Sequence, residues 1–517
     1  MLRTSRIWPT LPLRSRNGLL LVPSVAGALL ALLPVLYLGF RAGEQGLGQV
    51  IDEVTRPQTA RMLGRSAALT CGVTVLSTIV GLFCAFLVGA TDLRFKRFWE
   101  VVLAVPLAIP TYVVAYTWIG TFRDPPPFLG SLGVLVGSCY PYVYMTVLAA
   151  LKRLDPSLSD VGRSLGCNRR TVILRVIFPL TRPSTVSGAL LVALYVLSDF
   201  GAISLLRYET LTHGIYLSYV GSFDRTPAAV LSVLLVCLTT ILIVLEVRSR
   251  GAAATMITTA KGAPRATQLF PLGKAQRAAQ AILALIVAVA LGIPFRALVQ
   301  WTLDAQTIGL RSITQPFWST ILAAGLGSLA CVLLAIPIAT LSVRHPSRLS
   351  GMLEGSTYLG HSLPGLVIAL SMVFIGVRFL TPIYQRLPLL TLAYVVLFLP
   401  VAIAAIRSSI VQAPPALEEV GRSLGLSPAA ALRRITLPIA IPGIVSGFVL
   451  VTLAGVKELP ATLLLRPTGF DTLATRIWTD TTVADFSAAA PSALALVALG
   501  GLSVAALHRT TQKPKPR

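Results

Sequence analysis

Of the side chains in this sequence, two carboxylates have the type and position best suited to a functional role. Asp199 and Glu458 each follow a long apolar run, and they lie 259 residues apart. A carboxylate at the end of a membrane-length apolar segment is costly to bury, so it is usually functional or paired. The alternative is a structural role, in which the two acids pair with Arg207 and Arg466 or cap helix ends.

Other side chains that catalyse reactions or bind metals are not arranged for either task. The histidines form no HExxH motif, and no Ser/His/Asp arrangement is evident. The six cysteines are scattered and form no CxxC pair, so neither a zinc site nor a disulfide framework is predicted. We therefore assign no catalytic residue and no metal ligand, and a membrane enzyme is the weaker interpretation.

A longer pattern recurs at the same offset of 259 residues. The segment Asp160-Val-Gly-Arg-Ser-Leu-Gly166 corresponds to Glu419-Val-Gly-Arg-Ser-Leu-Gly425, and a proline follows the last glycine by 13 residues in both copies. Over the 29 positions from each acid onward, 12 are identical. Two polar loops this similar, in a chain that is otherwise mostly apolar, predict two equivalent docking points for a symmetric partner.

Each copy is predicted to form a short helix, a turn and a second helix. Proline at the first helical position starts the first helix, and a left-handed glycine ends it. A polar cap starts the second helix and a proline closes it; in chain order these residues are Pro156, Gly166, Asn168 and Pro179, and then Pro415, Gly425, Ser427 and Pro438. Leucine and valine at helical spacing give an apolar stripe that suits a groove on another protein, although it also suits a lipid surface.

The composition is that of a membrane protein. Hydrophobic residues make up 55% of the 517 residues and charged residues 12%, whereas soluble proteins average about 25% charged residues. The mean hydropathy is +0.78. A net charge of +24 does not indicate nucleic-acid binding, because the basic residues are spread over short loops and termini without interleaved aromatic residues.

About twelve apolar segments are long enough to cross ~30 Å of hydrocarbon, which predicts an all-α polytopic membrane protein of two parallel six-helix repeats. They lie near residues 18–40, 66–90, 99–120, 130–151, 184–206, 228–247, 278–299, 318–343, 355–377, 388–406, 441–461 and 488–507. The predicted domains are residues 1–247, with the first loop at 152–183, and residues 278–517, with the second loop at 407–440, joined by a basic linker at 248–277. Lys and Arg concentrate in the first loop, the linker and both termini, so these parts are expected to face the cytoplasm.

The two loops resemble the EAA motif of membrane subunits in bacterial binding-protein-dependent ABC importers. The spacing of acid, glycine and proline is kept, although Val and Gly replace the two alanines and Asp160 replaces Glu in the first copy. By this resemblance each loop docks into a cleft on an ATPase subunit, through Asp160, Arg163, Leu165 and Gly166 in the first loop and Glu419, Arg422, Leu424 and Gly425 in the second. The expected fold is that of a type I importer permease in the bacterial inner membrane.

The same resemblance predicts the partners. Two loops imply two copies of the ATPase subunit, and an extracytoplasmic substrate-binding protein would deliver the cargo. No G-x-x-x-x-G-K-[ST] motif occurs in the chain. We therefore expect no cofactor here and ATP bound by the partner subunit.

Two strings point to a cargo. Leu197–Glu209 and Val456–Pro467 resemble fused ferric-iron permeases, and the likeness covers essentially the whole chain. The resemblance implies ferric iron, with thiamine or polyamine as alternatives. A hard trivalent cation favours carboxylate or Tyr oxygens, so Asp199, Glu458 and Tyr195 are the candidates to line a translocation path.

A twelve-helix secondary transporter is the alternative of another class. It would need ionisable residues in mid-span as an ion relay. The centres of the predicted spans are nearly free of Asp, Glu, Lys and Arg, which argues against it.

Overall fold

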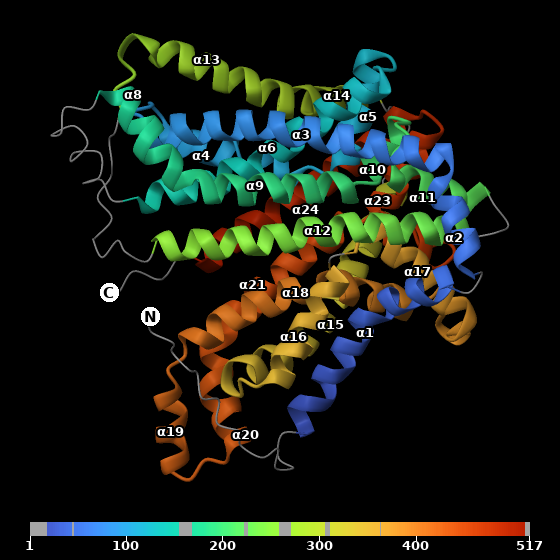
Figure 1. Ribbon diagram of the computed structural model, residues 1–517, viewed down its shortest axis with the longest axis vertical. Coiled ribbons are helices and arrows are strands. Elements are labelled where there is room, and N and C mark those ends of the chain that lie inside the picture. Colours follow the sequence, from blue (N-terminus) through green and yellow to red (C-terminus); the bar gives the residue numbers. More distant parts are fainter. Residues whose placement is uncertain are drawn as a thin grey trace. The chain divides into compact units, whose positions relative to one another are not determined.

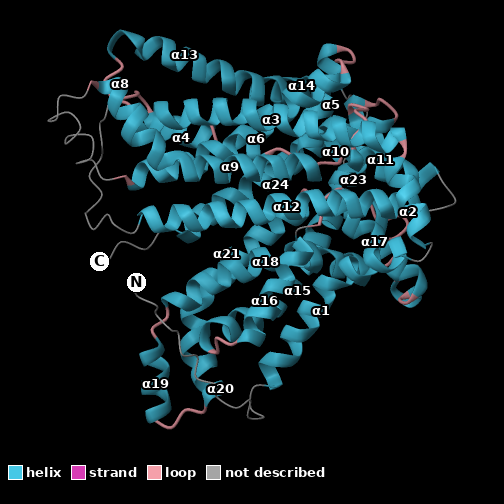
Figure 2. Ribbon diagram, in the orientation of Figure 1, coloured by secondary structure: helices cyan, strands magenta, loops and turns pink. Residues whose placement is uncertain are grey.

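The computed structural model describes residues 18–43, 46–154, 168–221, 226–257, 270–304, 311–361 and 363–511. Within these ranges the chain is helical apart from short connections (Figure 2). One isolated parallel bridge joins Thr91 and Phe270. A lipid-embedded chain must pair its own backbone groups, and helices do so within one segment. The predicted all-α class is confirmed.

Nine helices in the described ranges are long and apolar enough to cross a membrane. Most are single helices: α1 (Gly18–Gly43), α3 (Pro57–Ala90), α6 (Pro127–Arg153), α9 (Phe178–Ser198), α12 (Thr226–Ile257), α15 (Arg311–Arg344), α18 (Leu387–Gln412) and α21 (Leu437–Val456). The ninth runs through α13 (Gln276–Val287) and α14 (Ile293–Asp304). The apolar part of α24 (Phe486–Thr511) is shorter.

Two further predicted spans are sharply bent. The segment that contains α4 (Lys96–Val102) meets α5 (Thr111–Phe122) at 88°, and α16 (Arg348–His361) meets α17 (Gly365–Arg378) at 101°. Pro110 and Pro364 stand at the start of the second piece in each case. Proline has no N–H to continue a helix, which explains a break at the same place in both halves. Counting each bent pair as one span gives up to 11 spans in the described residues, and each predicted apolar segment has a helical counterpart.

Shorter helices connect the spans. They are α2 (Gly46–Thr55), α8 (Arg169–Val172), α10 (Gly201–Leu205), α11 (Leu211–Gly221), α19 (Pro415–Ser423), α20 (Pro428–Ala431), α22 (Pro460–Leu465) and α23 (Leu473–Thr482). The predicted segments 184–206 and 441–461 extended too far, because α9 and α21 end at Ser198 and Val456 and the short helices α10 and α22 follow. Between α9 and α10, and again between α21 and α22, lies an acidic residue that accepts hydrogen bonds from the helix that follows; both acids are described below.

The contacts divide the chain into two packed units. The first-half unit contains Phe40–Leu310 and Arg476–Val497, and the second-half unit contains Met1–Gly39, Arg311–Thr475 and Ala498–Arg517. In the first-half unit α3 packs on α6 and α9, and α9 packs on α12 (Figure 1). In the second-half unit α15, α18 and α21 pack on one another. The equivalent helices α3 and α15, α6 and α18, and α9 and α21 therefore form the same three-helix core twice.

The first helix of each half packs against helices of the other half. In the second-half unit Ala28 of α1 is buried with Leu341 and Leu353. In the first-half unit α14 packs on α5, and the Trp301 ring stacks on Tyr116 with 5.8 Å between ring centroids. This exchange was not visible in the sequence, because apolar segments of equal length do not say which neighbour they cover. The domain boundary within 248–277 stays a prediction.

Both repeated loops lead into their next span through a π-helical turn. These turns are Ile173–Ile177 and Leu432–Thr436, again 259 residues apart. Pro179 and Pro438 follow the turns in the first turn of α9 and α21. The prediction that these prolines close a separate second helix is wrong: each helix continues into the membrane-length segment. Proline is tolerated there because it stands just after the turn in which the regular hydrogen-bond pattern changes.

Candidate functional site

The second loop is described in full and has the predicted helix–turn–helix form. Helix α19 begins with Pro415 at its first position. Gly425 ends it with a φ of +92°, in the left-handed region. The Leu426 N–H donates to the Gly421 carbonyl (3.0 Å) and the Gly425 N–H to the Arg422 carbonyl (3.1 Å). This pair of bonds is the Schellman arrangement that terminates helices at glycine.

A polar cap starts the second helix of each loop, as predicted. The Ser427 hydroxyl accepts a hydrogen bond from the Ala430 N–H (3.3 Å). In the first copy the Asn168 side chain accepts one from the Thr171 N–H (2.8 Å). The remaining residues predicted for the first docking loop, namely Asp160, Arg163, Leu165 and Gly166, lie outside the described residues, so their placement stays a prediction.

Helix α19 presents apolar side chains to its surroundings. Leu417, Val420 and Leu424 are 44%, 55% and 80% exposed. Glu419 and Arg422 are exposed on the same helix. Large apolar side chains beside charged ones on a surface helix are typical of protein contacts or lipid contacts. Helix α19 therefore exposes an apolar face in the second loop, and its docking role stays a prediction.

Close packing holds the inner face of α19. Gly421 is buried, and a Cβ added there would lie 2.5 Å from Ile435 Cδ1 in the π-helical turn. This explains why glycine stands at the position where the EAA pattern has alanine. Sequence reasoning also missed Glu418, one residue before the predicted acid, whose carboxylate accepts hydrogen bonds from Arg344 and Thr436.

Asp199 lies between two helix starts in the first-half unit. Its Oδ1 accepts from the N–H groups of Ala202 (3.1 Å) and Ile203 (3.3 Å) in the first turn of α10. Its Oδ2 accepts from the hydroxyl of Thr111, the first residue of α5 (2.5 Å). The positive ends of both helix dipoles favour a negative charge at this point. The Asp199 carboxylate therefore connects the break between α9 and α10 to α5, the second piece of the bent span.

Glu458 occupies the equivalent place in the second-half unit. Its Oε1 accepts from the Ala461 N–H (3.0 Å) in the first turn of α22. A Cβ added at Gly365, the first residue of α17, would lie 3.3 Å from the same oxygen. Gly365 corresponds to Thr111 at the offset of 254 residues that aligns the two bent spans. The second carboxylate thus lies against α22 and α17, the elements equivalent to α10 and α5.

These contacts bear out the helix-capping part of the structural alternative. The predicted pairing of Glu458 with Arg466 does not occur, because Arg466 forms an ion pair with Asp471. Arg207 is exposed and has a positive φ, and the contacts described for Asp199 do not include it. A role for the two acids in a translocation path stays a prediction.

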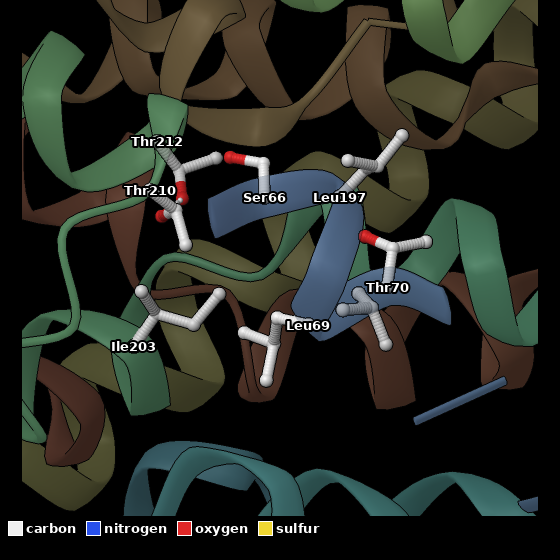
Figure 3. A pocket seen from close by; sticks show the side chains of 8 residues that line it. Ser66, Leu69, Thr70, Leu197, Ile203, Thr210 and Thr212 are labelled. Atoms are coloured by element: carbon white, nitrogen blue, oxygen red, sulfur yellow. Dashed lines mark hydrogen bonds between the residues drawn. The ribbon is translucent and has the colours of Figure 1, made fainter. Parts of the chain in front are cut away.

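A small polar cavity lies beside the Asp199 contacts. Ser66, Thr70, Thr210 and Thr212 line it, together with apolar residues of α3, α9 and α10 (Figure 3). The Thr212 hydroxyl also donates to the Asp199 backbone carbonyl (2.9 Å). Its volume is about 10 Å³, which is enough for one water molecule. The cavity is too small to hold a cargo larger than that.

The remaining candidates show no catalytic or metal-binding arrangement in the described part of the chain. Tyr195 is half-buried and packs against the Tyr142 ring, with 5.6 Å between centroids. His213 Nδ1 lies 3.3 Å from the Ser204 hydroxyl, and burial lowers the pKa of its imidazole. No group of three or more His, Cys, Asp or Glu residues that could hold a metal ion occurs among the described residues.

Two ion pairs with equivalent acids mark the repeat further. Glu100 of α4 pairs with Lys152 of α6 (2.9 Å), and Glu354 of α16 pairs with Arg407 of α18 (2.8 Å). The acids correspond at 254 residues. Each pair ties the first piece of a bent span to the helix that precedes a repeated loop.

The sequence matches a known family over most of its length. Residues 77–250 and 331–512 match the family described as "Binding-protein-dependent transport system inner membrane component". The two matched stretches contain the two repeated loops and both capping acids. The family model therefore applies once to each half of the chain.

Three curated proteins are similar over most of this chain. The "Fe(3+)-transport system permease protein FbpB 2" of Haemophilus influenzae is 36% identical over 92% of this chain and 95% of its own length. The "Probable ABC transporter permease protein y4fN" of Sinorhizobium fredii is 23% identical over 82% and 81%. The "Ferric transport system permease protein FbpB" of Actinobacillus pleuropneumoniae is 23% identical over 78% and 64%.

Proposed function

The chain belongs to the family of inner membrane components of binding-protein-dependent transport systems, and from this premise we propose that it is the permease of a ferric-iron ABC importer. It is a multi-pass inner membrane protein. Iron as the cargo is supported by the 36% identity, over nearly the whole of both chains, to a protein named as an Fe(3+)-transport permease. The strings Leu197–Glu209 and Val456–Pro467 support the same cargo.

The observation that best supports coupling to a partner is the open docking helix. Helix α19 is held rigidly at its start by Pro415 and at its end by Gly425, and its outer face exposes Leu417, Val420 and Leu424. An amphipathic helix of this kind suits a groove on another protein. We assign it, and the homologous first loop, to two copies of an ATP-hydrolysing subunit on the cytoplasmic side.

In this account the energy for transport comes from the partner. The chain has no phosphate-binding loop motif of its own. Closure of the two ATPase subunits moves the docking helices, and the membrane helices alternate between outward and inward openings. A substrate-binding protein delivers iron at the outer face, and both termini of this chain face the cytoplasm, where the positive-inside rule places the basic linker.

Uptake by a reconstituted transporter tests this function. Proteoliposomes would contain this chain, its ATPase and its binding protein, and would be offered ferric iron, thiamine or a polyamine in parallel. We expect ATP-dependent accumulation of iron alone. ATP-dependent accumulation of thiamine or polyamine would support the ABC importer class and refute iron as the cargo. Iron accumulation driven by an ion gradient without ATP would refute the importer class.

A further inference from the structure

One ion pair fixes the second docking loop to the end of a membrane-length helix. Arg344 is the last residue of α15, and its Nε lies 2.7 Å from Glu418 Oε1 in α19. The same guanidinium donates through Nη2 to the Ala413 carbonyl (2.9 Å), in the connection between α18 and α19. The side chains of Arg344 and Glu418 are only 10% and 23% exposed. Arg344 therefore bonds both the first turn of the docking helix and the connection that leads into it.

The Glu418 carboxylate also reaches the second helix of the loop. The Thr436 hydroxyl, at the end of the π-helical turn, donates to Glu418 Oε1. One carboxylate oxygen thus connects α15, α19 and the turn that leads into α21. These three elements belong to the second-half unit, and α15 and α21 are two of the three helices of its core.

The two positions of the first half that align with Arg344 and Glu418 cannot form this ion pair. At the 253-residue offset that aligns α3 with α15, the position of Arg344 is taken by Thr91. At the 259-residue offset that aligns the loops, the position of Glu418 is taken by Ser159. Neither residue can carry a charge at neutral pH. Although the loops share their acid, glycine and proline, they differ at the residue that attaches the second loop to the core.

A partly buried charge pair suits a mechanical connection. An Arg side chain offers several N–H donors in a fixed planar geometry, and here it uses two of them on the loop. Charge-assisted hydrogen bonds are shorter and stronger than neutral ones. The outer face of α19 is exposed, and the contacts that hold the helix against its unit include this ion pair, the Thr436 hydrogen bond to Glu418 and the packing of Gly421 on Ile435.

We propose that Arg344 and Glu418 are positioning residues that pass movement of the second docking helix to α15. The proposal rests on the function proposed above. It names residues outside the acid, glycine and proline of the repeated pattern. Motion imposed on α19 by the ATPase would displace the end of α15 directly, and Thr91 and Ser159, the residues aligned with Arg344 and Glu418, cannot form the same ion pair.

The test compares docking with coupling in the full transporter. Arg344→Gln, Glu418→Gln and the double variant would be assayed for the amount of ATPase that co-purifies and for iron imported per ATP hydrolysed. We expect normal co-purification, because the exposed face of α19 is intact, and a fall in iron imported per ATP of about tenfold in each single variant. The double variant should be no worse than either single one, as expected for residues that act as a pair.

Matched variants make the outcome decisive. Arg56→Gln removes an ion pair with Glu53 in the first-half unit and should leave the iron-to-ATP ratio unchanged. Arg344→Lys keeps the charge but has one nitrogen for two acceptors, so an intermediate ratio is expected. An unchanged amount of iron imported per ATP in Arg344→Gln would overturn the proposal. Parallel losses of ATPase co-purification and iron uptake would also overturn it, because they would show that the ion pair only stabilises the loop. If the wild-type complex neither assembles nor imports, the proposed function itself fails.

Discussion

Replacement of Gly425 by alanine tests how the docking helix ends. The φ of +92° at this residue is unfavourable for any residue with a Cβ, by about 1–2 kcal/mol. A Cβ there would meet no atom within 4 Å, so the whole cost is conformational. If the partner binds only the terminated helix, a penalty of about 1.4 kcal/mol weakens its binding about tenfold.

The assay is the affinity of the ATPase subunit for the detergent-solubilised permease. Gly425→Asn is the matched variant, because asparagine tolerates the left-handed region better than alanine and should bind the partner more tightly than Gly425→Ala. Gly355→Ala is the control: it lies exposed in α16 with no atom within 4 Å of an added Cβ. Wild-type affinity in Gly425→Ala, or equal losses in all three variants, would refute the role of the left-handed turn.

Three further changes probe the packing and the capping acids. Thr111→Val removes one of three donors to the Asp199 carboxylate and should lower the thermal midpoint in detergent, with about 1.5–3 kcal/mol of interaction lost; an unchanged midpoint would contradict the bond. Glu458→Ala should lose about 0.5–2 kcal/mol of helix-capping stability, and Glu458→Gln should lose less. Loss of iron uptake in Glu458→Gln at unchanged stability would show that Glu458 has a role in the translocation path. Gly421→Ala should weaken ATPase binding, because overpacking against Ile435 costs about 1–3 kcal/mol. Adding Ile435→Val to this variant removes the clashing Cδ1 and should restore ATPase binding; failure of this rescue would count against the contact between Gly421 and Ile435.

The sequence was sufficient for the class, for the repeat, and for the first helix, the turn and the second cap of the second loop. Hydropathy identifies apolar segments long enough to span a membrane, and every such segment has a helical counterpart. Pro415, Gly425 and Ser427 act locally, through a missing N–H, a missing Cβ and a short hydroxyl side chain. Such effects depend on the residue itself and can be predicted without tertiary contacts.

Other features depend on neighbours that are distant in sequence. The bends at Pro110 and Pro364 were hidden because each bent span still has enough apolar residues. The prolines at 179 and 438 did not stop their helices, because a π-helical turn precedes each one. Glu418 gave no signal, since its meaning depends on Arg344, which lies 74 residues away.

The two capping acids show where residue type alone leaves alternatives open. Equal spacing identified Asp199 and Glu458 as equivalent, and their cost in an apolar setting identified them as important. Only the contacts with α10 and α22 show that backbone N–H groups donate hydrogen bonds to the two carboxylates. An acid that holds two helix starts together can stand beside a path without binding the cargo, so the Glu458→Gln variant distinguishes these roles.

The most direct test of the central claim is ATP-dependent iron uptake into proteoliposomes by the wild-type complex and by Glu419→Lys. Glu419 is exposed on the docking helix, so its reversal should leave the protein folded and inserted. The account predicts iron uptake by the wild type and none by the variant. Normal iron uptake by Glu419→Lys, with the ATPase bound as in the wild type, would contradict it.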